Sequence, residues 1–512
     1  VQRVEVNKNK NNEAEEPKPT ETPQKPFSMG LGIGSATLDG VIYNQIALRP
    51  EIYIAKIGIG LDLAVYMDKD GNIREDDWDI ENDPSLLLDK ILYIRYAKRT
   101  DPIWIKYGSI ESLTLGYGGV INNYSNMMQY PSVRRVGTST GFNYKQVSGE
   151  LFLSNLKDIS RGGTVTGLRI QYTISDEIPI LLGFNYITDG NMFSSLKDKD
   201  NDTYPDVFDD FPNDSTIWND TDGDGWPDPG QGTGVPDSLI DIDADGDNIT
   251  DSQESNVDIE LKSIPFSLKD NKAKTTGFSF DVGYPILESN VISITLFAEY
   301  NKLNFQSAIS SDSSFVRRER SGTGITIPGL RSKILSFLNL SLEYRTINNA
   351  YLPQFFDQAY DINRIVTSSS NNQTIVRTKD MIIFESMSDS SKSSGLFGSA
   401  GFNLFDLADF TVSYANMKAD TSEIKSFSSF LTLNTDIIPK IRLATAYYQR
   451  NNDDNPFDFD NPTENTIMGY TIGYELSKGV SLIMDFKQSY RDDGTGNLEA
   501  IKQTNIETSF SF

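Results

Sequence analysis

Residues 468–476, MGYTIGYEL, are the stretch of sequence that decides the fold. Apolar side chains occupy every second position, at Met468, Tyr470, Ile472, Tyr474 and Leu476, and small or polar side chains lie between them. Strict alternation is typical of a β-strand that has one face in apolar surroundings and the other in water. After the turn SKG at 477–479, the run VSLIMDFK at 480–487 repeats the pattern. The two runs therefore predict consecutive strands joined by a tight turn.

The same alternation recurs along most of residues 27–512, for example at 168–174, 292–300 and 338–345. A soluble sandwich would hide such apolar faces between two sheets, with strands of about 5–6 residues. The runs here often reach roughly 10–13 residues, which matches strands that cross a membrane. Their polar faces carry charges that suit a water-filled lumen: Arg169, Glu299, Glu343, Arg345, Asp485 and Lys487.

The connections between these runs alternate in length. Tight connections lie at 176–179, 287–290, 405–409 and 477–479, and long polar ones at 350–372, 450–466 and 491–500. We therefore predict an all-β fold, a transmembrane antiparallel up-and-down β-barrel. Candidate strands number about nine before residue 187 and about eleven or twelve after residue 275; because some are expected to be halves or extramembrane hairpins, we predict about 18 strands, within roughly 14–20.

The C-terminal sequence NIETSFSF, residues 505–512, supports this interpretation. It places Ile506, Thr508, Phe510 and Phe512 on one face. It resembles the closing strand of Gram-negative outer-membrane β-barrel proteins, which characteristically end in Phe. The resemblance implies an outer-membrane location, contact with membrane lipid and recognition by the barrel-assembly machinery.

Composition excludes several classes of function. The 512 residues include no Cys and no His, so there is no disulfide, no thiolate or imidazole metal site and no Ser-His or Cys-His catalytic pair. We therefore expect no enzyme. The net charge of −26 argues against a nucleic-acid partner. No apolar run is long enough for a transmembrane helix. The chain begins at Val1 with no basic and apolar leader, and we expect that a signal peptide has been removed.

The chain divides into four expected segments. Residues 1–26, rich in Lys, Glu, Asn and Pro, predict a flexible tail. Residues 27–195 and 257–512 predict the two parts of the barrel, and 196–256 an acidic insert between them. Residues 196–255 hold 17 Asp, 1 Glu and 2 Lys, which gives −16 of the total charge.

The insert contains three stretches with the ligand spacing of a calcium loop. Ca²⁺ takes six to eight oxygens, which a short loop supplies from positions 1, 3, 5, 7, 9 and 12 with a tight turn at position 6. Asn248, Thr203 and Gly225 occupy the turn position, and Gln231 replaces the acid at position 12 of the middle loop. The predicted ligands are Asp198, Asp200, Asp202, Asp206, Asp209, Asp220, Asp222, Asp224, Asp228, Asp243, Asp245, Asp247, Asp251 and Glu254.

The stretch 198–228, with FPND and Trp218 between its loops, resembles bacterial thrombospondin type 3 repeats. That resemblance implies a helix-poor rod wrapped around several Ca²⁺ ions, and the alternative is a plain solvated acidic loop. The similar spacing at 68–79 has Ile73 at the turn position and favours a hairpin turn. The Gly-rich stretch 113–126 is either an inward-folded plug or another strand pair.

Two functions fit these features. One is a porin-like channel of the bacterial outer membrane with a calcium-stabilised extracellular rod. The other is a structural, adhesive or complex-forming protein whose insert contacts a surface partner or another copy of the chain. Long inserts normally occupy extracellular loops, and one strand after the turn at 176–179 places Leu196 outside.

Overall fold

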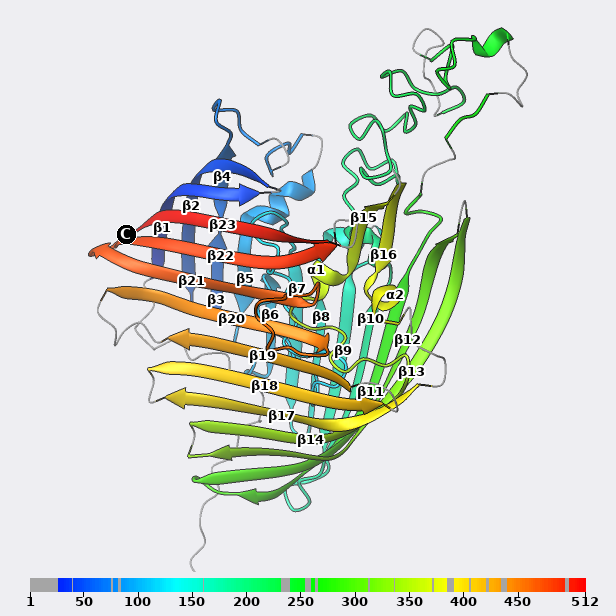
Figure 1. The fold of residues 1–512 in the computed structure, drawn as a ribbon. Helices are drawn as coiled ribbons and strands as arrows, with labels where there is room; N and C mark the ends of the chain where they lie inside the picture. Colours follow the sequence, from blue (N-terminus) through cyan, green and yellow to red (C-terminus); the bar gives the residue numbers. More distant parts are fainter. Residues whose placement is uncertain are drawn as a thin grey trace, which may run out of the picture.

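The protein is a closed antiparallel β-barrel with an insert projecting from one end (Figure 1). The computed structural model describes the chain except residues 1–25, 39, 75–76, 82–83, 160, 232–239, 254–258, 263–265, 312–313, 336, 371–372, 385–390, 405–406, 420–422, 434–439 and 493–496. The predicted N-terminal tail thus lies almost wholly outside the described residues. Around the wall each strand pairs with the wall strands before and after it, and the last, β23 (Leu498–Ser511), returns to pair with the first, β1 (Phe27–Leu38), from Gly30↔Ser511 to Ala36↔Asn505.

The strands of the barrel are long and follow one another around the wall. Their bounds are β1 Phe27–Leu38, β2 Val41–Ile54, β3 Ile57–Leu61, β4 Leu63–Met67, β5 Ile91–Tyr96, β6 Ile103–Gly108, β7 Gly137–Tyr144, β8 Val147–Leu153, β9 Val165–Thr173, β10 Leu181–Asp189, β11 Lys274–Glu288, β12 Ile292–Ser311, β13 Ser314–Ile334, β14 Leu338–Asn349, β17 Lys392–Leu404, β18 Ala408–Ala419, β19 Glu423–Leu433, β20 Ile441–Asp453, β21 Thr466–Ser477, β22 Val480–Asp492 and β23 Leu498–Ser511. The elements that are not part of the wall are the hairpin β15 Ile365–Ser370 and β16 Gln373–Thr378, the helices α1 Tyr360–Asn363 and α2 Lys379–Phe384, and the 3-10 turns η2 Pro84–Lys90, η3 Lys157–Ile159, η4 Met192–Ser195 and η6 Asp251–Gln253.

The wall has 20 strand positions. The main sheet counts 21 strands, but β3 and β4 pair with the two ends of β2 and are halves of one strand interrupted at Asp62. Twenty lies at the upper limit of the predicted range and above the expected 18. The raw count of nine and eleven candidates was right, since only one strand proved to be divided.

Connection lengths sort onto the two ends of the barrel. The tight turns after β9, β11, β17 and β21 share one end with the start of β1 and the end of β23. The opposite end carries all the long connections, at 68–90, 109–136, 190–273, 350–391 and 454–465. The long connections therefore share one end as predicted, but the short connections after β1, β12 and β18 lie there as well. The extents also differ: 350–372 continues to residue 391, 450–466 begins only after Asp453, and 491–500 is not a long connection, because β22 runs to Asp492 and β23 begins at Leu498.

Side chains alternate between an apolar outside and a polar inside, as the period of two predicted. In β9 the inward Arg169 is buried while the outward Ile170 is exposed, and in β14 Glu343 and Arg345 are buried while Leu342 and Tyr344 are exposed. Large apolar residues are exposed outward around the wall, among them Ile46, Ile103, Phe142, Tyr172, Phe280, Tyr300, Leu396, Ile472, Leu482 and Ile506. A soluble monomer rarely exposes such a continuous apolar surface. Among the described residues, no helix is long and apolar enough to cross a membrane.

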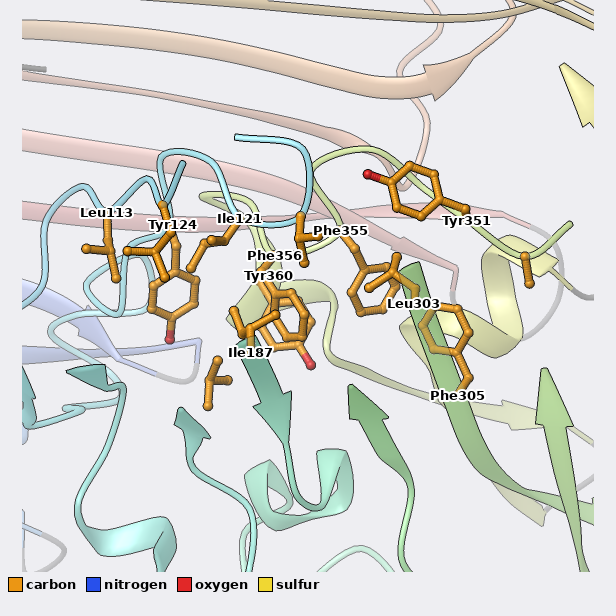
Figure 2. Packing of buried hydrophobic residues seen from close by; sticks show 14 of the residues in the cluster. Leu113, Ile121, Tyr124, Ile187, Leu303, Phe305, Tyr351, Phe355, Phe356 and Tyr360 are labelled. Carbon is orange, nitrogen blue, oxygen red and sulfur yellow. The ribbon is translucent and has the colours of Figure 1, made fainter. Parts of the chain in front are cut away.

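The main hydrophobic cluster lies inside the barrel. It joins residues of the 109–136 connection, such as Leu113 and Tyr124, to Phe355, Phe356 and Tyr360 of the 350–391 connection. Inward residues of the wall complete it, and Figure 2 shows Ile187, Leu303 and Phe305 beside the two connections. The two long connections thus fold into the lumen, and we call them the first lumen loop (109–136) and the second lumen loop (350–391).

The insert spans residues 190–273, which lie outside the wall strands and are drawn in teal and green at one end of the barrel in Figure 1. It is longer than the predicted 196–256, because 257–273, expected to be part of the barrel, precede β11. Its ends are joined by an apolar cluster that includes Met192, Phe193 and Phe266. Val376 of β16 belongs to the same cluster, so the base of the insert touches the second lumen loop.

Candidate functional site

The first lumen loop is attached to one side of the wall through its Gly-rich tip. Tyr117 stacks on Phe297 of β12 with ring centroids 3.8 Å apart, and its backbone N–H donates to Glu299 Oε1 at 3.3 Å. Arg331 of β13 donates to the Tyr117 carbonyl at 2.8 Å. A Cβ on Gly116 would lie 2.6 Å from Asn185 Nδ2, so only glycine allows this close approach to the wall.

The other end of the same loop is attached to strands across the barrel. Lys487 of β22 donates to the Tyr130 carbonyl at 2.7 Å, and Gln503 of β23 donates to Ser132 Oγ at 3.0 Å. Tyr130 donates to Asp62 at 2.6 Å, and Arg134 pairs with the same carboxylate. A segment that contacts β12 and β13 as well as β22 and β23 crosses the lumen. Of the two alternatives for residues 113–126, the inward-folded plug is therefore the one observed, closed by a Leu113↔Tyr124 bridge.

The second lumen loop pairs with the first and is anchored to the wall by a buried cation. Asn122 N–H donates to the Phe356 carbonyl at 3.1 Å, and Phe356 N–H to the Val120 carbonyl at 3.1 Å. Arg364 is fully buried, and its Nε donates to Asp189 Oδ2 at 2.6 Å. Its Nη2 also donates to the Asn191 carbonyl at 3.0 Å and to Ser194 Oγ at 3.0 Å, both in the base of the insert.

In the insert, the structure brings together the acids at positions 1, 3 and 5 of each predicted calcium loop. The carboxylates of each trio lie within 4.8 Å of one another. The three groups are Asp198, Asp200 and Asp202; Asp220, Asp222 and Asp224; and Asp243, Asp245 and Asp247. Like charges gathered at this distance repel unless a cation lies between them.

The backbone conformation at the turn position also agrees with the predicted calcium-loop spacing in all three loops. Position 6 has a positive φ in every loop, at Thr203 (87°), Gly225 (93°) and Asn248 (74°). A left-handed Thr is uncommon, so the loop conformation overrides its preference. The side chain at position 9 caps the start of each loop, since Asp206, Asp228 and Asp251 accept from the backbone N–H of residues 199, 221 and 244 at 2.8, 2.8 and 3.1 Å.

The first of the three predicted calcium loops has carboxylate oxygens left for a cation. Asp198, Asp200, Asp202 and the position-12 acid Asp209 each hold a buried carboxylate oxygen with no hydrogen-bond partner among the described residues. Burial, with the neighbouring acids adding to it, raises the pKa of Asp202 to about 6 and that of Asp209 to about 7. Unpartnered carboxylate oxygens are the hard ligands that Ca²⁺ prefers, so this donor set fits the ion.

The oxygen donors of the other two loops fit Ca²⁺ less completely. Asp243 also holds an unpartnered buried oxygen, and burial and nearby acids raise its pKa. In the middle loop both Asp220 oxygens accept backbone N–H groups, at 2.8 and 2.9 Å. Gln231 accepts from the Trp218 and Asn219 amides at 2.6 and 2.7 Å, so it fixes the preceding chain. Glu254, the predicted position-12 ligand of the third loop, lies outside the described residues.

The spacing at 68–79 forms a turn, as its Ile73 suggested. Asp68 accepts from the Asp70 and Asn72 amides at 2.9 and 2.8 Å, and Met67 bridges to Ile73. Sequence reasoning missed Lys262, which lies beyond the three predicted loops and ties the chain back to the middle one. Its Nζ donates to Asp210 at 2.8 Å and to the Asp220 carbonyl at 2.6 Å. Sequence reasoning also missed Arg364, because nothing local marks a buried cation that pairs across the fold.

Comparisons with known proteins identify no family. No protein-family model matches the chain, and no curated protein matches it. Solved structures similar in outline include the ferric enterobactin receptor PfeA of Pseudomonas aeruginosa (11% identity, 96% of this chain and 82% of that chain, TM-score 0.33). They also include OccAB4 of Acinetobacter baumannii (9%, 95% and 97%, TM-score 0.29) and CdiB of Acinetobacter baumannii (7%, 96% and 60%, TM-score 0.26). The chain thus spans 60% of the length of CdiB. At such scores the likeness carries no argument, and the barrel rests on its own strand pairing.

Proposed function

We propose that this chain is a channel of the bacterial outer membrane whose lumen is narrowed by two inward loops. The observation that carries the proposal is the closed ring of strands with exposed apolar side chains outside and paired charges inside. Lipid is the surrounding that such an outer face requires, and closure leaves the sheet without an unpaired edge strand. The same C-terminal strand that closes the ring would be read by the barrel-assembly machinery.

The long connections and the insert would face the cell exterior. In outer-membrane barrels the short turns are periplasmic and the long loops extracellular. That 190–273 shares its end with the other long connections supports an insert at the cell surface. Cells carrying a protease site at residues 240–250 should therefore lose the insert to external protease, while a site in the 478–479 turn should resist.

Conductance of the purified protein in planar bilayers tests the channel. We expect small, steady conductance in KCl, because the lumen loops leave only part of the interior open. Shortening the first lumen loop between Leu113 and Tyr124 should raise the conductance severalfold. A matched shortening of the insert between residues 220 and 253 should leave it unchanged. A barrel closed to ions in all three forms would contradict the proposal.

We further propose that Ca²⁺ orders the insert. What supports it is the convergence of three acid trios together with the unpartnered oxygens of the first loop. Sixteen net charges in residues 196–255 would otherwise repel one another. The insert should resist protease with Ca²⁺ and be cut rapidly after chelation, and equal rates in both conditions would contradict the proposal.

A second candidate function is contact with a surface partner or another copy of the chain. It is favoured by large apolar side chains exposed on the insert, including Val207, Trp226, Ile242 (70% exposed) and Ile249. A channel alone has no use for them. Deleting 196–255 should abolish assembly or adhesion and leave conductance intact, whereas lost conductance with intact assembly would favour a gating role. Neither candidate is an enzyme, in keeping with the composition.

A further inference from the structure

A cavity of about 240 Å³ lies between both lumen loops and the wall formed by β20, β21, β22 and β23. Met128 and Gln129 come from the first lumen loop, and residues 357–383 from the second. The cavity is somewhat smaller than a site for a drug-sized ligand, which occupies about 300–1,000 Å³. Because the cavity lies beside the loops that narrow the lumen, a solute that permeates the barrel could bind there.

The charges around this cavity are already paired. Of its 25 lining residues five are charged, and Asp357 pairs with Lys379 at 3.0 Å. Arg491 pairs with Glu499 at 3.3 Å, and Lys487 donates to the Tyr130 carbonyl. Glu464 also has an interaction within the protein. A charged solute would therefore find no unpaired opposite charge here, and its desolvation would not be offset.

Eight of the lining residues are Asn or Gln, so side-chain amides are the commonest polar groups around the cavity. Gln449 and Asn451 each donate an amide N–H to Asp357, at 2.8 and 3.1 Å, and Gln503 donates to Ser132. Each of these bonds uses one N–H and fixes the amide, which still offers its acceptor oxygen and a second N–H. Asn363 and Asn465 make no side-chain hydrogen bond among the described residues and offer both donor and acceptor.

Apolar side chains lie among these amides. Ile362, Ile365, Ile382 and Ile383 line the cavity from the second lumen loop. Acceptor oxygens match O–H donors, and aliphatic side chains match C–H groups. A small neutral molecule that carries both along its length is a polyhydroxylated one.

We propose that this cavity binds a mono- or disaccharide on its way through the barrel. The proposal rests on the proposed channel, and it assigns that channel a neutral, hydroxyl-rich substrate. Asn363 and Asn465 form hydrogen bonds with the sugar hydroxyls, and the side-chain carbonyl oxygens of Gln449, Asn451 and Gln503 accept from those hydroxyls.

Calorimetry on the full-length barrel in detergent tests the site without requiring conduction. Glucose and maltose are the probes, with the dipeptide Gly-Gly and citrate as the competing classes. We expect the sugars to bind, and Asn363→Leu and Asn465→Leu each to weaken binding about tenfold without moving the heat-induced gel shift of the folded barrel. Gln306→Leu, on the rim of β12 far from the cavity, is the matched control and should bind as the wild type does.

The outcomes separate the site from the channel. Sugar binding lost in both Asn variants but kept in Gln306→Leu supports the site even if the barrel conducts no ions in planar bilayers. No sugar binding in a conducting barrel overturns the site and leaves the channel standing. Tighter binding of Gly-Gly or citrate than of the sugars, or unchanged binding in both Asn variants, overturns it as well.

Discussion

Replacing Arg364 with Met should release the second lumen loop. The guanidinium and its partner Asp189 are 1% and 0% exposed, and two of its nitrogens bond the two Asp189 oxygens at 2.6 and 2.7 Å. Met fills a similar volume but leaves Asp189 buried as a charge whose remaining donors, within the described part of the chain, are Tyr360 Oη at 2.7 Å and the Asn191 amide at 3.2 Å. Removing one partner of a buried ion pair costs about 3–5 kcal/mol.

We expect the substitution to lower the stability of the second lumen loop rather than that of the whole barrel, since the strands do not depend on Arg364. A loop held by a few buried contacts opens below the free energy of global unfolding. We expect protease to cut residues 350–391 of Arg364→Met about 100-fold faster than in the wild type, which is about 2.7 kcal/mol of local stability. Planar-bilayer conductance should rise in parallel, because the loop leaves the lumen.

The double variant Arg364→Met with Asp189→Asn is the decisive control. It removes the unpaired charge while keeping a group of nearly the same shape, so it should recover most of the protection lost in the single variant. A single variant as resistant as the wild type would refute the anchor. A double variant cut as fast as the single one would show that packing, rather than the ion pair, holds the loop.

Three further predictions concern the insert and the outer face. Asp202→Asn with Asp209→Asn should raise the Ca²⁺ concentration that protects the insert from protease by at least tenfold, whereas Asp176→Asn, in a turn at the other end, should not. Because the pKa values of these two acids are raised to about 6 and 7, both carboxylates take up protons as pH falls from 8 to 5. Protonation relieves the repulsion in the metal-free insert, but it must be reversed when Ca²⁺ binds, so calcium titrations should show affinity falling as pH falls through this window. Equal affinity at pH 8 and pH 5 would contradict this prediction. Ile472→Arg, on the outer face of β21, should lower the free energy of unfolding of the barrel in lipid by about 2–4 kcal/mol, measured by urea unfolding. Leu476→Arg, beside the turn, should lower it by about 1 kcal/mol or less. Equal losses in the two variants would mean that lipid does not cover this face.

The sequence predicts those parts of the molecule that depend on neighbours in the chain. Alternation at 468–476 is a local property of a strand with two different faces, and the spacing of Asp198, Asp200 and Asp202 is local to one loop. The path of the first lumen loop is not local. It depends on contacts such as Tyr117 with Glu299 and Ser132 with Gln503, which join residues 182 and 371 positions apart.

The same distinction between local and long-range contacts explains the two main differences between the predicted fold and the observed one. Strand division at Asp62 depends on Arg49 and Arg134, which pair with its carboxylate from β2 and from the first lumen loop. The insert extends to residue 273 because Phe266 and Ala273 pack against Met192 and Phe193 at its beginning. Neither contact leaves a periodic signal in the sequence.

The three predicted calcium loops occupy unequal positions relative to the lumen. The first is bound to the base of the insert: Arg161 donates to the Leu196 and Asp198 carbonyls at 3.1 and 3.0 Å, and Phe208 packs on Phe266. Through Phe266 and Val376 that base touches the second lumen loop. The middle and third loops lie farther along the insert, where Trp226 and Ile242 are exposed. A cation in the first loop would therefore support the structure that holds the second lumen loop, whereas cations in the other two would support the surface that a partner would meet. Under the two proposed functions, channel and surface contact would then depend on different parts of one insert.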